Sequence, residues 1–392
     1  MPKKGLNPYK RKDGLWECQY YIGTDPLTGK RKKVTRYGKT EKEAKDKILD
    51  AISQIKTGTY VERNKITIGT WFTEWLEVYA KPKVKQSTYA NYRLHINKRV
   101  IPNIGHVRLS DLRVDILQRF FNEQGETGSL KNSGGGLSPK TLRNLYVMMH
   151  TALKQAYENS LIPKNYLELV KLPKVSQTEM RVLSVDENQR LYDEIKTSDE
   201  RYKIGVLICL TTGIRVGELV GLQWQDIDEE KRIMKIRRTL NRLPAMDMSK
   251  NKTEIVIGTP KSDKSVRDIP LPDFLFDFLH EYKSARDKEQ LLAGAAYDTR
   301  GFVICNELGN PVEPRTMQDT FKRLIKAANI DAANFHCLRH TFATRAIESG
   351  VEIKTLSEIL GHADVSTTLN KYGHSLPEQK RKMMDTVSAF YK

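Results

Sequence analysis

Cysteine is scarce in this sequence, and long apolar runs are absent. The four cysteines stand far apart in 392 residues and form no Cys-x-x-Cys pair, which argues against a disulfide framework and a thiolate zinc site. We expect all four to be small buried hydrophobes. There is no run of about 18 apolar residues and no signal-peptide core. We therefore expect a cytoplasmic protein that does not enter the membrane.

A phosphate-binding loop is also absent. Glycines cluster in residues 125–136, but the pattern Gly-x-x-x-x-Gly-Lys-Ser/Thr does not occur there. We expect this segment to be a flexible loop that does not cradle nucleotide phosphates.

Positive charge, in contrast, is abundant. The chain has 66 Lys and Arg against 48 Asp and Glu, a net charge of +18 and a pI of about 9.5. Such an excess favours an extended polyanionic partner. Nucleic acid is the leading candidate, and an anionic membrane surface is the rival. A chain of this length is expected to form two or three domains.

Residues 1–62 are expected to form a small antiparallel sheet covered by one helix. Segments 16–22 and 33–37 are rich in β-branched and aromatic residues, with a turn signal at 25–29 between them. A capping box at Thr40 begins a helix with one apolar stripe. The first 65 residues carry 17 Lys and Arg but 8 Asp and Glu. We predict a DNA-binding module, with a merely solvated basic face as the alternative.

Residues 63–172 are expected to be helical. Ser87 is the expected cap of one helix, and Ser138 with the proline after it begins another. The Lys and Arg side chains between residues 81 and 99 are expected either to contact nucleic-acid phosphates or to be simply solvated. The polar stretch around 173–182 is the expected linker. The expected aromatic core comprises Trp71, Phe72, Trp75 and Tyr79.

Residues 183–392 are expected to form a mostly helical domain with a small antiparallel sheet. The apolar run 204–211 predicts a buried helix that ends at Gly213. Three alternating runs predict a three-stranded sheet, and they are 232–238, 254–258 and 266–271. The predicted fold class of the chain is multidomain α+β.

Arg215 is the first candidate for phosphate chemistry. It follows the turn at Gly213 and precedes a short amphipathic helix, so its planar fork could meet a phosphate at a helix N-terminus. The alternative is an ordinary ion pair with Glu218, three residues on. The two interpretations are compatible if Glu218 orients the guanidinium of Arg215.

Lys261 lies in the segment 259–265, between two predicted strands, and is expected at a hairpin tip. A lysine at such a tip is usually exposed and inert. Close to other cations its pKa would fall, and it could then donate a proton to a leaving alkoxide.

His336 and Arg339 are three residues apart, and His340 follows four after His336. The first spacing places an imidazole and a guanidinium on one helical face. The second also fits two metal ligands. The metal interpretation is weak because no carboxylate directly follows His336 and no third ligand has a recognisable spacing.

His362 stands just after a helix that ends at Gly361, where the helix C-terminus favours an imidazolium. Tyr372 follows ten residues later on a short helix that Asp364 or Ser366 could cap. A tyrosine, two arginines and histidines suit phosphoryl transfer without a metal.

In order, the segments 212–219, Lys261, 336–340, 360–362 and 372–374 resemble the signature of the tyrosine recombinases. The whole chain is similar to the lambda-type integrases of phages and conjugative transposons. The resemblance is strongest from residue 175 onward. It implies an arm-site DNA-binding domain (1–62), a core-site DNA-binding domain (63–172), a linker (173–182) and a catalytic domain with a C-terminal tail helix (183–392).

The same resemblance implies how a scissile phosphate is held. Arg215 and Arg339 would grip its non-bridging oxygens and offset the charge of the transition state. His362 would hydrogen-bond a phosphate oxygen, and Glu218 would support Arg215.

The remaining roles concern bond breaking. Tyr372 would attack the phosphorus to form a 3′-phosphotyrosyl link, and Lys261 would protonate the departing 5′ oxygen. His336 would accept or relay the tyrosyl proton, while His340 would brace its helix. The implied reaction uses no metal, no cofactor and no ATP.

The expected partner is double-stranded DNA at core and arm sites, bound by a homo-tetramer. A tail helix is expected to start at Leu376 and Pro377, with an apolar stripe of Met383, Met384, Val387, Phe390 and Tyr391. The stripe could fold back onto its own domain, but the resemblance favours docking on a neighbouring subunit. An excisionase or host DNA-bending protein could set direction. DNA affinity should fall steeply with salt. The alternatives are a type IB topoisomerase that only relaxes DNA, a DNA-binding regulator with a lapsed site, and a metal-dependent nuclease.

Overall fold

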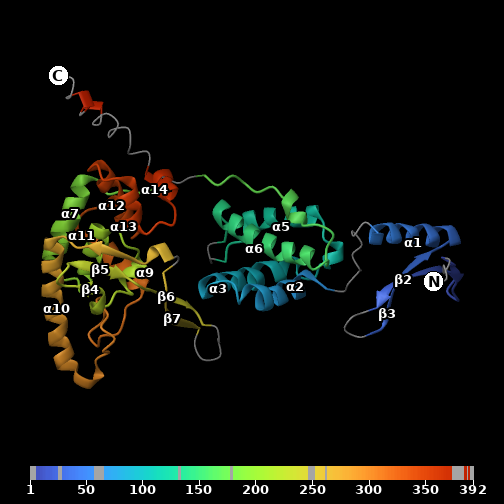
Figure 1. The fold of residues 1–392 in the computed structure, drawn as a ribbon, viewed down its shortest axis with the longest axis horizontal. Coiled ribbons are helices and arrows are strands. Elements are labelled where there is room, and N and C mark those ends of the chain that lie inside the picture. Colours follow the sequence, from blue (N-terminus) through green and yellow to red (C-terminus); the bar gives the residue numbers. More distant parts are fainter. Residues whose placement is uncertain are drawn as a thin grey trace. The chain divides into compact units, whose positions relative to one another are not determined.

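The computed structural model describes residues 6–24, 29–56, 66–130, 134–176, 180–245, 252–260, 263–372, 384–385 and 387–388. The chain divides into two compact units, residues 1–176 and 177–392, whose elements are labelled in Figure 1. None of the helices in the described ranges combines the length and apolarity that a membrane span requires. The four cysteines are buried and unpaired, as predicted.

Unit 1 begins with a three-stranded antiparallel sheet covered by one helix, which confirms the predicted architecture. The helix packs Ala44, Ile48 and Ala51 against Cys18 and Val34 of the sheet. The expected turn at 25–29 lies, from 25 to 28, outside the described residues. The elements are β1 (Tyr9–Lys10), β2 (Trp16–Thr24), β3 (Arg31–Gly38) and α1 (Glu41–Lys56), with strand order β1-β2-β3.

The rest of unit 1 is helical around the predicted aromatic core. Trp71 is buried, and its indole Nε1 donates a hydrogen bond to the carbonyl of Ala152 (2.9 Å), which satisfies the one polar atom of the ring. The helical elements are α2 (Ile68–Glu74), η1 (Trp75–Ala80), α3 (Gln86–His95), η2 (Ile96–Val100), α4 (Ile101–Ile104), η3 (Leu109–Asp111), α5 (Val114–Thr127), α6 (Pro139–Glu158) and η4 (Tyr166–Leu169).

One predicted cap in this region is wrong. The N–H groups of Thr88 and Tyr89 bond to the carbonyl of Lys85, so Ser87 already lies inside the first turn of α3 and Lys85 is the cap. Ser138 does cap α6, since its hydroxyl accepts from the N–H of Thr141.

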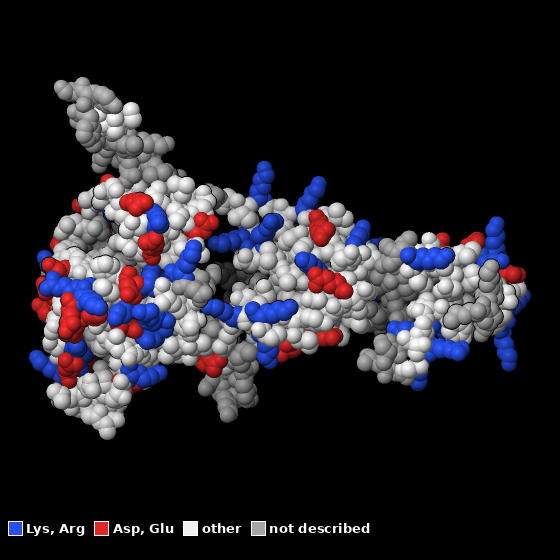
Figure 2. Space-filling model, viewed as in Figure 1, with Lys and Arg blue, Asp and Glu red and all other residues white. Residues whose placement is uncertain are grey.

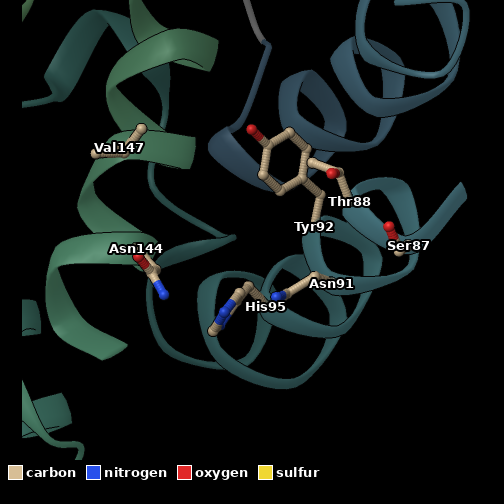
Figure 3. Close-up of a pocket in the computed structure, with 7 residues that line it drawn as sticks. All are labelled: Ser87, Thr88, Asn91, Tyr92, His95, Asn144 and Val147. Atoms are coloured by element: carbon tan, nitrogen blue, oxygen red, sulfur yellow. The ribbon is translucent and has the colours of Figure 1, made fainter. Parts of the chain in front are cut away.

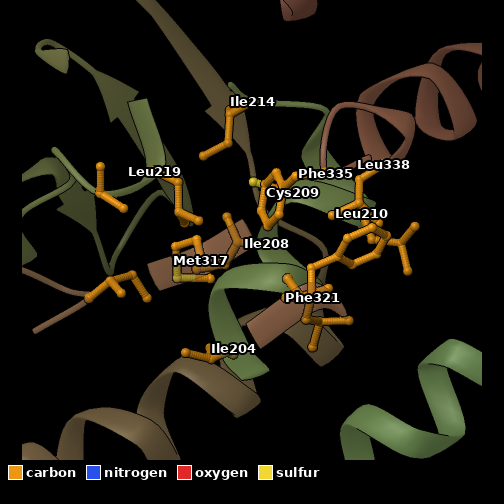
Figure 4. Packing of buried hydrophobic residues seen from close by; sticks show 14 of the residues in the cluster. Ile204, Ile208, Cys209, Leu210, Ile214, Leu219, Met317, Phe321, Phe335 and Leu338 are labelled. Carbon is orange, nitrogen blue, oxygen red and sulfur yellow. The ribbon is translucent and has the colours of Figure 1, made fainter. Parts of the chain in front are cut away.

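Unit 2 is built around the buried helix α8, which ends at Gly213 as predicted, with φ of 66°. Figure 4 shows Ile204, Ile208 and Leu210 of α8 packed among residues of neighbouring helices. The helical elements are α7 (Val185–Thr197), α8 (Lys203–Thr212), α9 (Val216–Leu219), η5 (Trp224–Asp226), η6 (Asp263–Ser265), α10 (Asp273–Ala293), η7 (Gly294–Ala296), α11 (Pro314–Ala327), α12 (Cys337–Glu348), α13 (Ile353–Leu360) and α14 (Val365–Tyr372).

The predicted three-stranded sheet of unit 2 is wrong in its pairing. One sheet has the order β4 (Ile227–Asp228), β5 (Ile233–Ile236), β8 (Arg267–Pro270), and a separate ribbon pairs β6 (Thr239–Pro244) with β7 (Thr253–Gly258). Burial explains the split, because Met234 and Ile269 face the core whereas β7 has no buried residue. The segment 259–265 therefore connects two sheets and is not a hairpin tip.

Candidate active site

Arg339, on α12, is the centre of the candidate site. Only 2% of the residue is exposed. Its guanidinium donates to the carbonyls of Gly213 (2.8 Å) and Leu360 (2.7 Å), which lie at the C-terminal ends of α8 and α13. Helix C-termini carry partial negative charge, so both ends stabilise a buried cation. The two glycines that end these helices, Gly213 and Gly361, both adopt left-handed backbone conformations.

Arg215 lies beside this centre as the cap residue of α9. Its Nη1 donates to Glu218 Oε1 (2.7 Å) and its Nη2 to the carbonyl of Gly361 (3.4 Å). The ion pair suggested by the sequence is thus present, and Arg215 keeps 36% of its side chain exposed. A partly exposed fork with a fixed orientation can still receive a ligand.

Glu218 also pairs with a third arginine that sequence reasoning missed. Arg267 Nη2 donates to Glu218 Oε2 (2.9 Å), and the Arg267 side chain is 7% exposed. The available signal was strand alternation, because Arg267 shares one face of β8 with the buried Ile269. Burial raises the pKa of Glu218, but the charges of Arg267 and Arg215 outweigh it and hold this pKa below its ordinary value.

Positive charge dominates the site. Burial, followed by repulsion from Arg215, lowers the pKa of Arg339 to about 9. A cavity of about 340 Å³ opens beside Arg339 and His336. An anion in that cavity would offset the repulsion among the cations. The rest of its lining is Ile214, Val216, Gln318, Lys322, Ala333, Asn334 and Phe335.

His362 is held from both ring nitrogens. Arg339 Nη2 lies 2.8 Å from Nε2, and Thr368 Oγ1 lies 2.8 Å from Nδ1. Because a guanidinium only donates, Nε2 accepts and Nδ1 carries the proton that goes to Thr368. Burial and the charge of Arg339 lower the pKa of His362 to about 3. The expected imidazolium is therefore wrong for this state, since burial, together with the neighbouring cations, outweighs the helix end.

Tyr372 lies at the end of α14 and is 1% exposed. It packs in a small apolar cluster with Ile347 and Leu356, and its hydroxyl oxygen lies 2.9 Å from Nδ1 of His340. Burial raises the pKa of Tyr372. His340, expected only to brace its helix, is thus the histidine in contact with the tyrosine hydroxyl.

His336 caps α12, is exposed and lines the cavity. Its ring centroid is 4.6 Å from that of His340. Burial lowers the pKa of His340 to about 4. Desolvation by the surrounding protein, followed by repulsion from His340, also lowers the pKa of His336. Because the ring is exposed, water screens part of this shift.

Lys261 lies outside the described residues, as does His374. The neighbouring Lys264 donates from Nζ to the carbonyl of Ala363 (2.9 Å), one residue after His362. Asp364 caps α14, because its Oδ1 accepts from the N–H of Ser366 (2.9 Å). The chain just after Lys261 therefore lies against the loop that carries His362.

Models of known families match three parts of the chain. The one described as "Phage integrase family" matches residues 181–379. "Phage integrase, N-terminal SAM-like domain" matches residues 67–124, and "Arm DNA-binding domain" matches residues 8–55.

Similar proteins span the chain. "Tyrosine recombinase XerC-like" of Caldanaerobacter subterraneus subsp. tengcongensis is 30% identical over 402 residues, covering 100% of both chains. The structure of the Tn1549 transposon integrase with transposon right end DNA is 22% identical, with a TM-score of 0.66, covering 82% of this chain and 99% of that one. A lambda integrase tetramer bound to a Holliday junction is 19% identical, with a TM-score of 0.54, covering 95% and 97%. These two structural matches establish likeness of fold.

Proposed function

Because this chain belongs to the phage integrase family of tyrosine recombinases, we propose a specific task for each residue gathered around Arg339. The protein is a site-specific recombinase of mobile elements, and it cleaves and rejoins DNA. The proposal concerns which atoms do this.

Arg215 and Arg339 bind the non-bridging oxygens of the scissile phosphate. Arg339 lines the cavity, and so do Ile214 and Val216, the two chain neighbours of Arg215. The observation that carries this assignment is the fixed guanidinium of Arg339, held by two helix-end carbonyls and His362. A preformed cation needs no reorganisation when charge grows on the phosphate in the transition state. Glu218 orients Arg215, and Arg267 keeps Glu218 in place.

Tyr372 is the nucleophile. Its oxygen forms a bond to phosphorus, the bond to the 5′ oxygen breaks, and a 3′-phosphotyrosyl ester remains. Lys261 supplies the proton to the departing 5′ oxygen. A 5′-hydroxyl of another strand reverses the step, so bond energy is conserved and no ATP is needed.

The tyrosyl proton passes through the histidines of α12. His340 contacts the hydroxyl while Tyr372 is buried, and His336, which lines the cavity, accepts the proton at the phosphate. Both rings are shifted toward the neutral form that a proton acceptor requires. His362 hydrogen-bonds a phosphate oxygen once the phosphate engages Arg339.

Tyr372 is buried and is not one of the residues that line the cavity beside Arg339, so we infer that it moves before it attacks. Helix α14 must leave its apolar cluster before attack, so the described state is a resting one. Assembly on DNA is the event that releases α14, and cleavage by monomers should be correspondingly slow.

The protein binds DNA, and we propose the division of labour among its regions. Residues 1–62 bind the arm sites and residues 63–172 bind the core sites. Residues 173–182 link these regions to residues 183–392, which catalyse DNA cleavage and rejoining. Recombination takes place in a homo-tetramer in the cytoplasm, where DNA is. An excisionase or host bending protein selects integration or excision.

The test uses a supercoiled plasmid that carries the two ends of the encoding mobile element. The plasmid is incubated with the protein in EDTA and without ATP. Excised circles should appear with the wild-type chain and not with Tyr372→Phe. Relaxation without strand exchange would indicate the type IB topoisomerase alternative. Dependence of cleavage on added Mg²⁺ would indicate a nuclease.

A further inference from the structure

Three arginines of unit 2 gather at the C-terminal end of α13. Three consecutive carbonyls there accept hydrogen bonds, each from a different arginine: Ile359 from Arg267, Leu360 from Arg339 and Gly361 from Arg215. The end of a helix carries partial negative charge and favours cations. By contrast, Figure 3 shows a cavity in the described part of unit 1 that is lined by uncharged side chains and one histidine. The end of α13 therefore collects positive charge, and Arg267 is the arginine whose task there is still open.

Arg267 uses every nitrogen of its guanidinium on protein acceptors. Nε donates to the carbonyl of Ile359, Nη1 to the carbonyl of Ser265 (2.9 Å) and Nη2 to Glu218 Oε2 (2.9 Å). The side chain is 7% exposed, and a Cβ on Gly361 would stand 2.9 Å from Nη1. A buried fork with three protein partners is committed to protein rather than to a phosphate. Arg267 thus holds segments of the chain together.

One of these segments is the chain that follows Lys261. Lys261 comes four residues before Ser265 in the sequence and lies outside the described residues. Ser265 is 2% exposed, and Lys264 donates to the carbonyl of Ala363 in the loop after α13 (2.9 Å). The exit of the Lys261 segment is therefore fixed against α13 and the loop that follows it.

The other segment is α9, which Arg267 contacts through Glu218, and here a second arginine contributes. Glu218 also accepts from the backbone N–H of Arg215 (3.1 Å) and from Arg215 Nη1 (2.7 Å). Without Arg267, the buried carboxylate would keep the cation of Arg215 beside it, so the orientation of Arg215 should largely persist. The bridge from Ser265 to Ile359, in contrast, passes through the Arg267 guanidinium itself. Loss of Arg267 should therefore be felt mainly on the Lys261 side.

We propose that Arg267 is a positioning residue for proton donation to the leaving group, because it fixes the segment that carries Lys261 against the end of α13. In cleavage the oxygen of Tyr372 bonds to phosphorus, the bond from phosphorus to the 5′ oxygen breaks, and a proton from Lys261 neutralises the departing alkoxide. Arg267 transfers no proton and touches no reacting atom. Displacement of the donor by about 1 Å would slow cleavage about a hundredfold. This role rests on the proposed function, in which Lys261 is the proton donor.

A duplex with sulfur in place of the bridging 5′ oxygen at the scissile phosphate isolates this step. A thiolate leaves without a proton, so a defect in proton donation disappears on the sulfur duplex, whereas a defect in the phosphate grip persists. Single-turnover cleavage of the oxygen and sulfur duplexes is measured in EDTA with the full-length wild-type chain, Arg267→Gln and Arg267→Lys. Lys261→Ala and Glu218→Gln are the references for the two kinds of defect.

Arg267→Gln should cleave the oxygen duplex about a hundredfold more slowly than the wild type. On the sulfur duplex it should cleave close to the wild-type rate, as Lys261→Ala does. Arg267→Lys should have an intermediate rate on oxygen, because an ammonium keeps the charge but cannot bond three acceptors in one plane. Arg237→Gln is the matched control and should cleave both duplexes like the wild type. Arg237 is an exposed arginine that pairs with Asp268, the residue next to Arg267 (3.6 Å).

Three results would contradict this role. Equal slowing of Arg267→Gln on both duplexes, as expected for Glu218→Gln, would place Arg267 in the phosphate grip and overturn its part in proton donation. Unchanged cleavage of the oxygen duplex would overturn any positioning role. Failure of sulfur to rescue Lys261→Ala would mean that the proton donor is misassigned, which is a failure of the proposed function and removes the role of Arg267 with it.

Duplex affinity and melting temperature matched to those of Arg237→Gln establish that Arg267→Gln is folded. If the buried Gln destabilises the chain, Arg267→Lys carries the test, because it keeps the positive charge beside Glu218. Its slower cleavage of the oxygen duplex must then also be relieved by sulfur, and an equal loss on both duplexes would overturn the role.

Discussion

At the scale of single residues, Arg339 is positioned by backbone more than by side chains. Two helix-end carbonyls accept hydrogen bonds from its Nη atoms, and the left-handed Gly213 and Gly361 end those helices. A Cβ on Gly213 would stand 2.5 Å from a ring carbon of Phe342, so space as well as φ favours glycine there. The sequence identified Arg339 by its motif, but the carbonyls that hold it have no sequence signature.

Arg339→Lys should bind DNA with little change yet cleave at least about a hundredfold more slowly. An ammonium is a point charge and cannot hold three acceptors and a phosphate in one plane. Single-turnover cleavage and DNA affinity, measured on the same duplex, separate the two effects. Lys322→Arg, which changes an exposed residue of the cavity rim, is the control. A parallel loss of affinity and cleavage would argue against a transition-state role.

The histidines predict how stability depends on pH. His340 has an ordinary pKa of 6.5 in the unfolded chain and about 4 in the folded one. Between these values the unfolded state binds more protons, so stability is full above about 6.5 and is lost as pH falls toward 4. Urea unfolding of the wild type at pH 7 and pH 5 should show this loss.

His340→Gln should make the loss shallower by up to about 1.4 kcal/mol per pH unit, because one such proton no longer binds. His280→Gln, an exposed histidine on α10 of the same unit, should leave the slope as in the wild type. Equal slopes for all three proteins would contradict the burial effect assigned to His340.

At the scale of elements, α14 joins Tyr372, the proposed nucleophile, to the proposed phosphate site. Tyr372 contacts His340 of α12, and Thr368, one turn earlier, accepts from His362, which in turn accepts from Arg339. Thr368 is fully buried. A hydrogen-bonded chain thus runs from the docked helix to Arg339, and a phosphate that engaged Arg339 as we propose would compete with the contact that holds α14.

Thr368→Val should loosen α14 by about 1–3 kcal/mol, because it leaves the Nδ1–H of His362 without its acceptor. Hydrogen exchange of residues 365–372 reports this directly as faster amide exchange. Thr367→Val keeps the volume change without touching His362 and is the matched control. Exchange rates that are the same in both variants would contradict the anchoring role of Thr368.

The elements also show what the sequence can and cannot predict. Apolar periodicity predicted α1 and α6 because their buried faces repeat every three or four residues. The continuous apolar run 204–211 predicted α8, which is buried on nearly every side. Periodicity failed for the sheet pairing of unit 2, because β7 has no buried face to fix its register. It also missed Arg267, whose importance depends on Glu218 lying 49 residues away in the chain.

At the scale of the whole molecule, positive charge is distributed over every region. In Figure 2, Lys and Arg side chains project from the visible face of both units, and Asp and Glu accompany them most densely on unit 2. The first 65 residues carry 17 Lys and Arg against 8 Asp and Glu, an excess of positive charge that suits phosphate contacts. Domain-level assignments rest on this charge and on the family models.

Removal of residues 378–392 should abolish tetramers on DNA while leaving single-site binding intact. The expected tail helix lies mostly outside the described residues, but Met384 and Val387 of its apolar stripe are 65% and 38% exposed. Exposed apolar side chains such as these two are available to a neighbouring subunit. Analytical ultracentrifugation with duplex DNA measures the assembly. Unchanged tetramers would contradict docking in trans.

The assignment of Tyr372 as nucleophile is tested most directly by trapping the covalent intermediate. A nicked suicide substrate is incubated with the protein in EDTA, and the products are resolved on a denaturing gel. A nick next to the scissile phosphate lets the leaving strand diffuse away, so the 3′-phosphotyrosyl ester accumulates. We expect a covalent protein–DNA adduct with the wild-type chain and none with Tyr372→Phe. An adduct that persists in Tyr372→Phe, or one that requires a divalent metal, would contradict the assignment.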